Sequence, residues 1–201
     1  MKIGILSDIH ESNDYLVNAI DLLDRRKVDQ YVLLGDIFET GREVRETVRI
    51  LRQINTVGVF GNHDLGLAIE PDQESRDRYG DDVIDFFLAL KVRHRVGEFL
   101  FSHVNAMWDG FDVLAYYLNP APWEDPEFGN SFEVHPSLVQ FNGHYHCWRH
   151  AIDEVWSDWN GTEPLAFPEG KRHFLIHNAV FEGWCSELDT QECVLTPIYL
   201  G

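Results

Sequence analysis

Residues 57–64 read VGVFGNHD, a short apolar run that ends in Gly-Asn-His-Asp. The same arrangement occurs twice earlier in the chain, at 3–10 (IGILSDIH) and at 31–36 (YVLLGD). Apolar residues at helical spacing lie between these runs: Leu16, Ile20 and Leu23, then Val44, Val48 and Leu51. Alternating strand-like and helical patterns predict an α/β fold made of βαβ units, in which helices cover a parallel sheet.

The second half of the chain is richer in strand signals. Residues 92–96 and 99–101, separated by Gly-Glu, are typical of an antiparallel hairpin, and a helix is expected before them at 83–90. Further strands are expected at 139–142, 174–177 and 194–195. We therefore expect one domain over residues 1–201, α/β in its first half and more β-rich in its second.

The segment 105–137 differs from its surroundings, because it is rich in aromatic, proline and acidic residues and contains no lysine or arginine. Apart from a helical pattern at 112–118 it looks irregular, and such a stretch inside a domain is often a lid or a binding loop. We expect it to form a cap. Its aromatic residues either form a small core or offer a stacking wall to a planar group: Trp108, Tyr116, Tyr117 and Trp123.

The composition bounds the class of protein. The chain of 201 residues is 44% hydrophobic, which is too apolar for intrinsic disorder, and no stretch approaches the ~20 apolar residues of a membrane span. The first residues become charged too soon for a signal peptide. The three cysteines are odd in number and lack a CxxC spacing, which favours free thiols in a reducing compartment. A soluble cytoplasmic protein is expected.

The formal net charge is −18, and it is distributed unevenly. Residues 1–95 hold 13 basic and 18 acidic side chains, whereas residues 96–201 hold 16 acidic ones and only Arg149, Lys171 and Arg172 as bases. Binding of nucleic-acid polymers and anionic membranes depends on Lys and Arg, so both are disfavoured as partners. A small phosphate ester remains compatible, since bound metal ions reverse the local charge.

Potential metal ligands follow five of the expected strands. They are Asp8 and His10, Asp36, Asn62 with His63 and Asp64, His103, and His144 with His146. Ligands of open α/β sheets bind outside the carboxyl ends of the strands, so these side chains are expected to converge. Oxygen donors mixed with imidazoles suit first-row divalent metals, and two ions sharing Asp36 would suit in-line displacement at phosphorus.

The ordered set Asp8-x-His10, Gly35-Asp36, Gly61-Asn62-His63-Asp64, His103 and Gly143-His144-Tyr145-His146 resembles the calcineurin-like metallophosphoesterase family. The resemblance implies a four-layer α/β/β/α sandwich with two mixed β-sheets and a dimetal site between them. It assigns one metal to Asp8, His10, Asp36 and His146, and the other to Asp36, Asn62, His103 and His144. His63 resembles the acid that protonates the leaving group, and Asp64 the carboxylate that orients it.

The sequence departs from the family pattern in two places. The protein phosphatase branch carries Gly-Asp-x-Val-Asp-Arg-Gly, whereas residues 35–41 read GDIFETG, with Glu39 and Thr40 in place of Asp and Arg. Arg42 lies close in sequence to Thr40, the position where that branch has its arginine. Near the end, the family's Asn-Pro-Gly-Ser turn is replaced by His-Asn-Ala-Val at 177–180.

Other histidines and a cysteine have simpler expected roles. His94, His135, His150 and His173 are expected to be solvated rather than metal ligands, and Cys147 is expected to be a packed thiol. His177 follows an expected strand, and a place at the edge of the site is left open for it.

The leading hypothesis is a dinuclear metal-dependent phosphoesterase that hydrolyses small phosphomonoesters or phosphodiesters. Mn²⁺ is the favoured ion, with Fe, Zn²⁺, Co²⁺ or Ni²⁺ as alternatives. The alternatives are a serine/threonine-type protein phosphatase, which Thr40 disfavours, and a non-catalytic binding protein of the same fold. A nuclease is disfavoured by the shortage of basic residues. The physiological substrate and the oligomeric state are left open.

Overall fold

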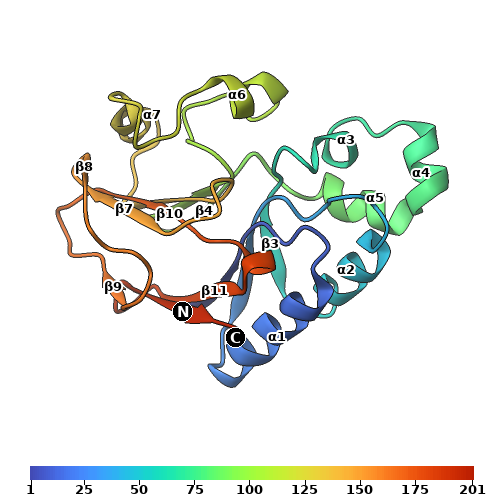
Figure 1. Ribbon diagram of the computed structural model, residues 1–201, viewed down its shortest axis with the longest axis horizontal. Coiled ribbons are helices and arrows are strands. Elements are labelled where there is room, and N and C mark those ends of the chain that lie inside the picture. The colour runs from blue at the N-terminus through green and yellow to red at the C-terminus, as the bar shows by residue number, and fades with distance from the viewer.

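Two six-stranded mixed sheets face each other in the computed structural model, which describes all residues 1–201 (Figure 1). The first sheet has the order β3 (Thr56–Val59), β2 (Gln30–Leu34), β1 (Lys2–Leu6), β11 (Trp184–Asp189), β12 (Val194–Tyr199) and β9 (Leu165–Ala166). The second has the order β4 (Arg93–Val96), β5 (Phe99–Ser102), β6 (Val139–Asn142), β10 (His173–Ile176), β7 (Arg149–Ile152) and β8 (Val155–Trp156).

The helices are short, and most precede the second sheet in the chain. They are α1 (Asn13–Arg25), α2 (Val44–Leu51), α3 (Leu65–Ala68), α4 (Gln73–Tyr79), α5 (Asp81–Leu88), α6 (Val113–Leu118) and α7 (Ser131–Val134), with 3₁₀ turns η1 (Phe128–Asn130) and η2 (Val180–Glu182). None of them has the length and apolar character that a membrane span requires.

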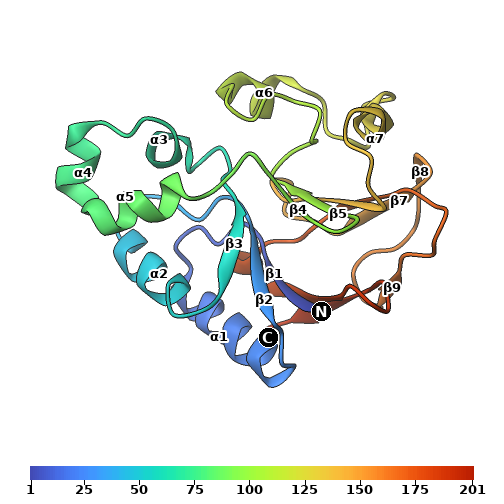
Figure 2. The same ribbon diagram turned by 180° about the vertical axis from the view of Figure 1, so that it is seen from behind.

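Both faces of the first sheet are buried, which explains why its parallel strands read as continuous apolar runs. Ile5 and Val32 point toward the second sheet and join one core with Phe101 and Phe141, whose rings stack 5.0 Å apart. Leu33, on the opposite face, packs into a core with the helices. Figure 2 shows α1, α2 and α5 along this outer side of β1–β3.

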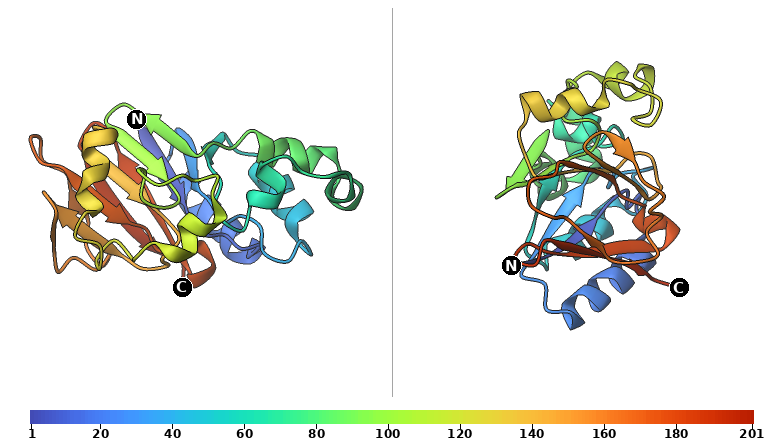
Figure 3. Two further views of the ribbon diagram at one scale, coloured as in Figure 1. Left: turned by 90° about the horizontal axis from the view of Figure 1, so that it is seen from above. Right: turned by 90° about the vertical axis from the view of Figure 1, so that its left-hand side faces the viewer.

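The fourth layer comes from the segment 105–137. Phe128 of η1 and Phe132 of α7 pack on Phe174 and Ile176 of β10, on the outer face of the second sheet. Figure 3 shows α6 and α7 on one side of the sheets and α1 on the other. The expected four-layer arrangement of two mixed sheets and outer helices is therefore confirmed, with a short and partly irregular outer layer.

Strand direction determines where the site lies. β1, β2 and β3 run parallel, and β5, β6 and β10 run parallel to one another, so each set ends at one edge of its sheet. The expected helix at 83–90 ends at Leu88 instead, and the strand at 194–195 extends to Tyr199. Strand β11, at the centre of the first sheet, was not predicted, because its sequence WCSELD lacks a clear apolar alternation.

Candidate metal centre and active site

The seven predicted metal ligands come together at the carboxyl ends of the strands. Asp8 and His10 follow β1, Asp36 follows β2, and Asn62 follows β3 of the first sheet. His103 follows β5, while His144 and His146 follow β6 of the second sheet. The donors therefore enter the site from both sheets.

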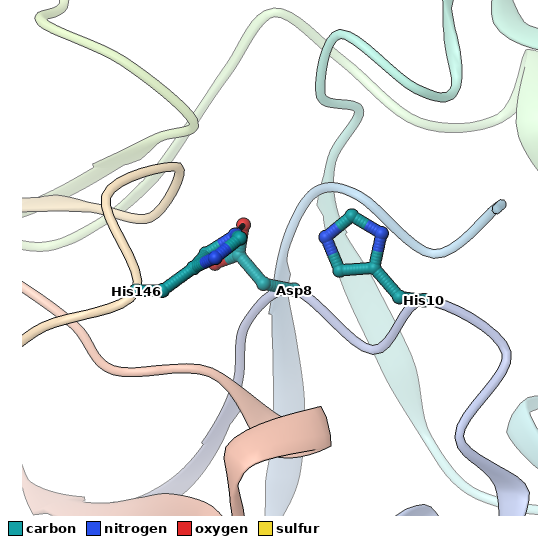
Figure 4. Close-up of side chains that lie close together, drawn as sticks. All are labelled: Asp8, His10 and His146. Atoms are coloured by element: carbon teal, nitrogen blue, oxygen red, sulfur yellow. Dashed lines mark ion pairs between the residues drawn. The ribbon is translucent and has the colours of Figure 1, made fainter.

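The first donor cluster consists of Asp8, His10 and His146, whose ligand atoms lie within 4.8 Å of one another. Asp8 Oδ1 is 3.2 Å from His146 Nε2. In Figure 4 the His146 ring overlaps the Asp8 carboxylate in this view, and His10 lies on the opposite side of Asp8. The backbone N–H of His144 donates to Asp8 Oδ1 at 3.1 Å, which holds the loop after β6 against the end of β1.

The second donor cluster consists of Asp36, His103 and His144, again within 4.8 Å. The amide oxygen of Asn62 joins it, at 3.1 Å from His103 Nε2 and 2.9 Å from His144 Nδ1. Asn62 Nδ2 donates to the Tyr117 hydroxyl at 3.1 Å, which turns the amide oxygen toward the imidazoles.

Asp36 lies between the two clusters. Its Oδ2 is 3.2 Å from His103 Nε2 and 3.8 Å from His10 Nε2. A shared carboxylate suits two neighbouring cations, because its negative charge offsets part of the repulsion between them.

Two contacts orient the imidazoles of His103 and His10, so that the Nε2 atom of each faces the donor clusters. His103 Nδ1 donates to the Leu34 carbonyl at 2.6 Å, since a carbonyl only accepts, and this leaves Nε2 to face Asp36 and Asn62. His10 Nδ1 lies 2.7 Å from Glu39 Oε2, and its buried Nε2 has no hydrogen-bond partner. Carboxylate, amide and imidazole groups that converge in this way fit divalent cations, and the mixed N/O donor set suits first-row metals.

The backbone at the site is strained. Left-handed φ angles occur at Asp8 (51°), His10 (46°), Asp36 (51°), His144 (70°) and His146 (48°). Such conformations cost on the order of 1–3 kcal/mol each in residues other than glycine, and they concentrate at functional sites. Gly35 is needed nearby, because a Cβ at its φ of +90° would lie 2.6 Å from His103 Nδ1.

Protonation within the second cluster follows its charges. Burial alone would lower the pKa of His103, but the Asp36 carboxylate raises it to about 9. Burial acts to raise the pKa of Asp36, but the charge of His103 outweighs burial and holds this pKa below its usual range. Burial and the charge of His103 lower the pKa of His144 to about 4. The proton shared by Asp36 and His103 thus lies where a metal ion could bind in its place.

His63 is exposed beside the first cluster, with its ring edge-on to His10 at 4.7 Å. Its Nδ1 lies 3.2 Å from Glu39 Oε2, the same oxygen that contacts His10. Glu39 therefore orients both imidazoles. In the sequence, Glu39 stood out only as a departure from the family pattern.

The carboxylate of Asp64 has other partners in this structure. It is fully buried and accepts hydrogen bonds of 2.9 Å from three backbone N–H groups, those of Ile37, Phe38 and Gly61. Asp64 thereby ties the loop after β2 to the loop after β3. Contact with the His63 imidazole, which the resemblance implied for Asp64, is made by Glu39 instead.

A second carboxylate, overlooked in the sequence, shapes the same loop. Glu11 is buried and accepts from the backbone N–H groups of Glu39, Gly41 and Glu43 at 2.9, 2.6 and 2.8 Å. These contacts hold the loop that places Glu39. No local pattern marked Glu11, because its partners lie about 30 residues away.

The aromatic residues of segment 105–137 divide between the two expected roles. Trp108 and Tyr116 are buried with Val104 in a small core of the segment. Tyr117 is 63% exposed and reaches Asn62 through its hydroxyl, so it lies on the rim of the site. Trp123 is half-buried and packs against Tyr145 at 5.3 Å.

Several histidines occupy places that the sequence did not predict. His150 and His173 are buried, not solvated, and His150 Nε2 lies 3.0 Å from His173 Nδ1. They face inward because they lie on β7 and β10, strands of the second sheet. His177 is buried and bonded to the Asn178 carbonyl and Ser186 Oγ, rather than at the edge of the site.

The site opens to solvent through a pocket of about 430 Å³ lined by His10, Ser12, Glu39, His63, His146 and Phe181. A larger pocket of about 600 Å³ lies where β5 and β6 begin, next to Phe99 and Leu138. That pocket is at the opposite ends of these strands from His103 and His144, so it takes no part in the site.

A model of the calcineurin-like phosphoesterase family matches residues 1–195. The chain belongs to this family. Its members are metal-dependent, and the two donor clusters of this calcineurin-like phosphoesterase provide groups that can bind metal ions. The predicted family is thereby confirmed.

Solved structures share the fold. A metallophosphoesterase from Sphaerobacter thermophilus is similar over 100% of this chain and 88% of its own, with a TM-score of 0.77 at 20% identity. A structure described as a novel archaeal phosphodiesterase is similar over 99% of both chains, with a TM-score of 0.57 at 14% identity. A putative diadenosine tetraphosphatase is similar over 100% and 95%, with a TM-score of 0.58 at 14% identity.

Among curated proteins, an uncharacterized protein of Methanocaldococcus jannaschii is 31% identical over 78 residues. The match covers 39% of this chain and 32% of that protein.

Proposed function

We propose that this calcineurin-like phosphoesterase hydrolyses small phosphate esters with two divalent metal ions. The observation that carries the proposal is the pair of donor clusters that share Asp36. Asp8, His10, Asp36 and His146 would hold one ion, and Asp36, Asn62, His103 and His144 the other. When bound, such a pair supplies a water nucleophile and stabilises charge on the phosphoryl oxygens.

The protein's own residues prepare the remaining chemistry. Glu39 Oε2 lies 3.2 Å from His63 Nδ1, which leaves Nε2 as the nitrogen for a leaving-group oxygen. We assign proton donation to this Nε2. Asp64 and Glu11 act indirectly, because their backbone contacts keep the loops after β2 and β3 in place.

The surroundings favour a small ester with little charge. Segment 105–137 caps the site, contributes the exposed Tyr117, and has acidic but no basic residues. Such a rim disfavours polyphosphates, and we propose diesters and lightly charged monoesters as substrates. The description of one structural relative as a phosphodiesterase agrees with this choice.

We propose Mn²⁺ as the working ion, because mixed carboxylate, amide and imidazole ligation suits it, although Fe, Zn²⁺, Co²⁺ and Ni²⁺ also accept such ligands. The three free cysteines support a reducing, cytoplasmic location.

The test is hydrolysis of p-nitrophenyl phosphate and bis-p-nitrophenyl phosphate by protein stripped with a chelator and reloaded with each metal. We expect turnover that depends on about two ions per chain. Asp72→Asn serves as a matched control, since Asp72 only caps α4. Binding of two ions without any turnover would favour the non-catalytic binding protein.

A further inference from the structure

Arg149 lies at the same edge of the second sheet as the ligand loop 143–146. It is the first residue of β7 and pairs with Ile176, the last residue of β10. Ile176 in turn pairs with Asn142, which precedes the ligand loop. The strand register therefore places Arg149 beside the site, on the side of the second sheet's ligands.

The guanidinium of Arg149 is held by an aromatic ring. Its central carbon lies 4.3 Å from the centre of the Trp123 ring, a cation–π contact with the cap segment. Stacking restricts the side chain, and Arg149 remains exposed.

Arg149 is also the unpaired cation of the second half of the chain. Of the three basic residues after residue 95, Lys171 pairs with Asp153, and Arg172 pairs with Glu133 and Glu154. Arg149 is exposed and makes no ion pair. In a chain of net charge −18, an arginine without a carboxylate partner is available to an anion from outside.

Aromatic contacts connect this arginine to a proposed metal ligand. The Trp123 ring is 5.3 Å from that of Tyr145, and the Tyr145 ring is 4.9 Å from that of His144. Tyr145 and Trp123 thus form a continuous row of rings between the second donor cluster and the guanidinium.

We propose that Arg149 is a specificity-determining residue that binds a second, singly charged oxyanion on the part of the substrate beyond the reacting phosphate. The planar guanidinium matches a carboxylate in a two-point hydrogen bond. One cation in acidic surroundings balances one negative charge, so a carboxylate or a diester phosphate fits and a polyphosphate does not. This inference rests on the proposed phosphoesterase function.

The test is a ladder of phosphonates, which bind like phosphate esters but have no ester bond to hydrolyse. Alkylphosphonates with two to six methylenes are compared with the same chains ending in a carboxylate, by calorimetry on Mn²⁺-loaded protein. At the chain length that reaches Arg149, we expect the carboxylate to tighten binding by ~10–100-fold. Arg149→Gln is expected to abolish this gain and to leave the affinity for the plain alkylphosphonate within about twofold of the wild-type value.

Arg78→Gln is the matched control. Arg78 is also exposed, also stacks on a ring (Tyr79, at 5.0 Å), and lies on α4, outside the site. The Arg78→Gln substitution removes the same charge as Arg149→Gln, and this variant is expected to keep the full gain in affinity from the carboxylate. Arg149→Lys, which keeps the charge without the planar fork, is expected to keep part of the gain.

Three outcomes would overturn the proposal. If no carboxylate tightens binding to the wild type, Arg149 does not select substrates. If Arg149→Gln weakens the binding of both phosphonate series equally, Arg149 only holds segment 105–137 against β7. If plain alkylphosphonates do not bind and p-nitrophenyl esters are not hydrolysed, the proposed function fails, and the role of Arg149 falls with it.

Discussion

Glu39 Oε2 lies 3.2 Å from His63 Nδ1 and 2.7 Å from His10 Nδ1. One carboxylate thus orients both the proposed acid and a proposed metal ligand, from a loop that the buried Glu11 holds through three backbone amides. Glu39 therefore acts on the imidazoles directly, whereas Glu11 acts through the backbone, and substitutions can test such roles separately.

Glu39→Gln should lower activity, whereas Asp64→Asn should lower stability. Loss of a carboxylate that orients a catalytic or ligating imidazole typically lowers activity or metal affinity by ~10–100-fold. Glu39→Gln should therefore lower kcat on phenyl phosphate by that factor, with little change in Tm. Asp64→Asn places an amide against three backbone donors and should lower the free energy of unfolding by ~1–3 kcal/mol. Slow turnover of Asp64→Asn at an unchanged Tm, with Glu39→Gln fully active, would assign the orienting role to Asp64.

Asp36→Asn should lower the metal content more than replacement of any ligand that serves one ion. The reason is that the Asp36 carboxylate lies between the two clusters and would neutralise both cations. Elemental analysis of Asp36→Asn beside Asn62→Ala and His146→Ala measures this, with hydrolysis as the second readout. Two ions per chain and near-normal turnover in Asp36→Asn would show that the carboxylate is not shared.

His63→Ala should keep both metals and slow the hydrolysis of esters with poor leaving groups by ~10²–10⁴-fold. The loss should be smaller for nitrophenyl esters, because nitrophenolate leaves with little need of a proton. Comparison of phenyl and p-nitrophenyl phosphate checks the difference. An equal loss on both esters would mean that His63 stabilises charge rather than donates a proton.

Diesters such as bis-p-nitrophenyl phosphate should be turned over faster than ATP. Segment 105–137 has the exposed Tyr117 available for stacking, and its acidic residues should repel a chain of phosphates. Tyr117→Ala should raise KM for aryl esters while folding stays intact, whereas Trp108→Ala, in the small core of the cap, should lower Tm. ATP hydrolysis faster than that of every diester tested would contradict the electrostatic part of this prediction.

The buried His150 should make the fold sensitive to acid. Burial, with a smaller contribution from His173, lowers the pKa of His150 to about 4, below its ordinary 6.5. Between these values the unfolded chain takes up a proton that the folded chain excludes, so the free energy of unfolding falls as the pH is lowered from 6.5 to 4. Urea unfolding at pH 7 and pH 5 should show a loss smaller by ~1–3 kcal/mol in His150→Gln than in the wild type. An identical loss in both proteins would exclude His150 as its source.

The sequence alone determined the family, the sheet-and-helix architecture and the set of donors around the site. These could be predicted because the signal is local. Apolar runs such as 31–34 predict strands, and the residues that directly follow them, such as Asp36 and Asn62, must lie at the strand ends. Parallel strands end at one edge, so chain order was enough to bring the donors together.

Only the tertiary structure decided which partner each donor has and what lies around the site. The resemblance assigned the His63 contact to Asp64, but Asp64 is buried and bonded to three backbone amides, and Glu39 contacts His63 instead. The burial of His150 and His173 required the unpredicted pairing of β7 with β10. The stacking of Arg149 on Trp123 joins residues 26 positions apart by side-chain packing. Periodicity and motifs report which face a residue occupies in its own element, whereas contacts between elements depend on packing that no local pattern encodes.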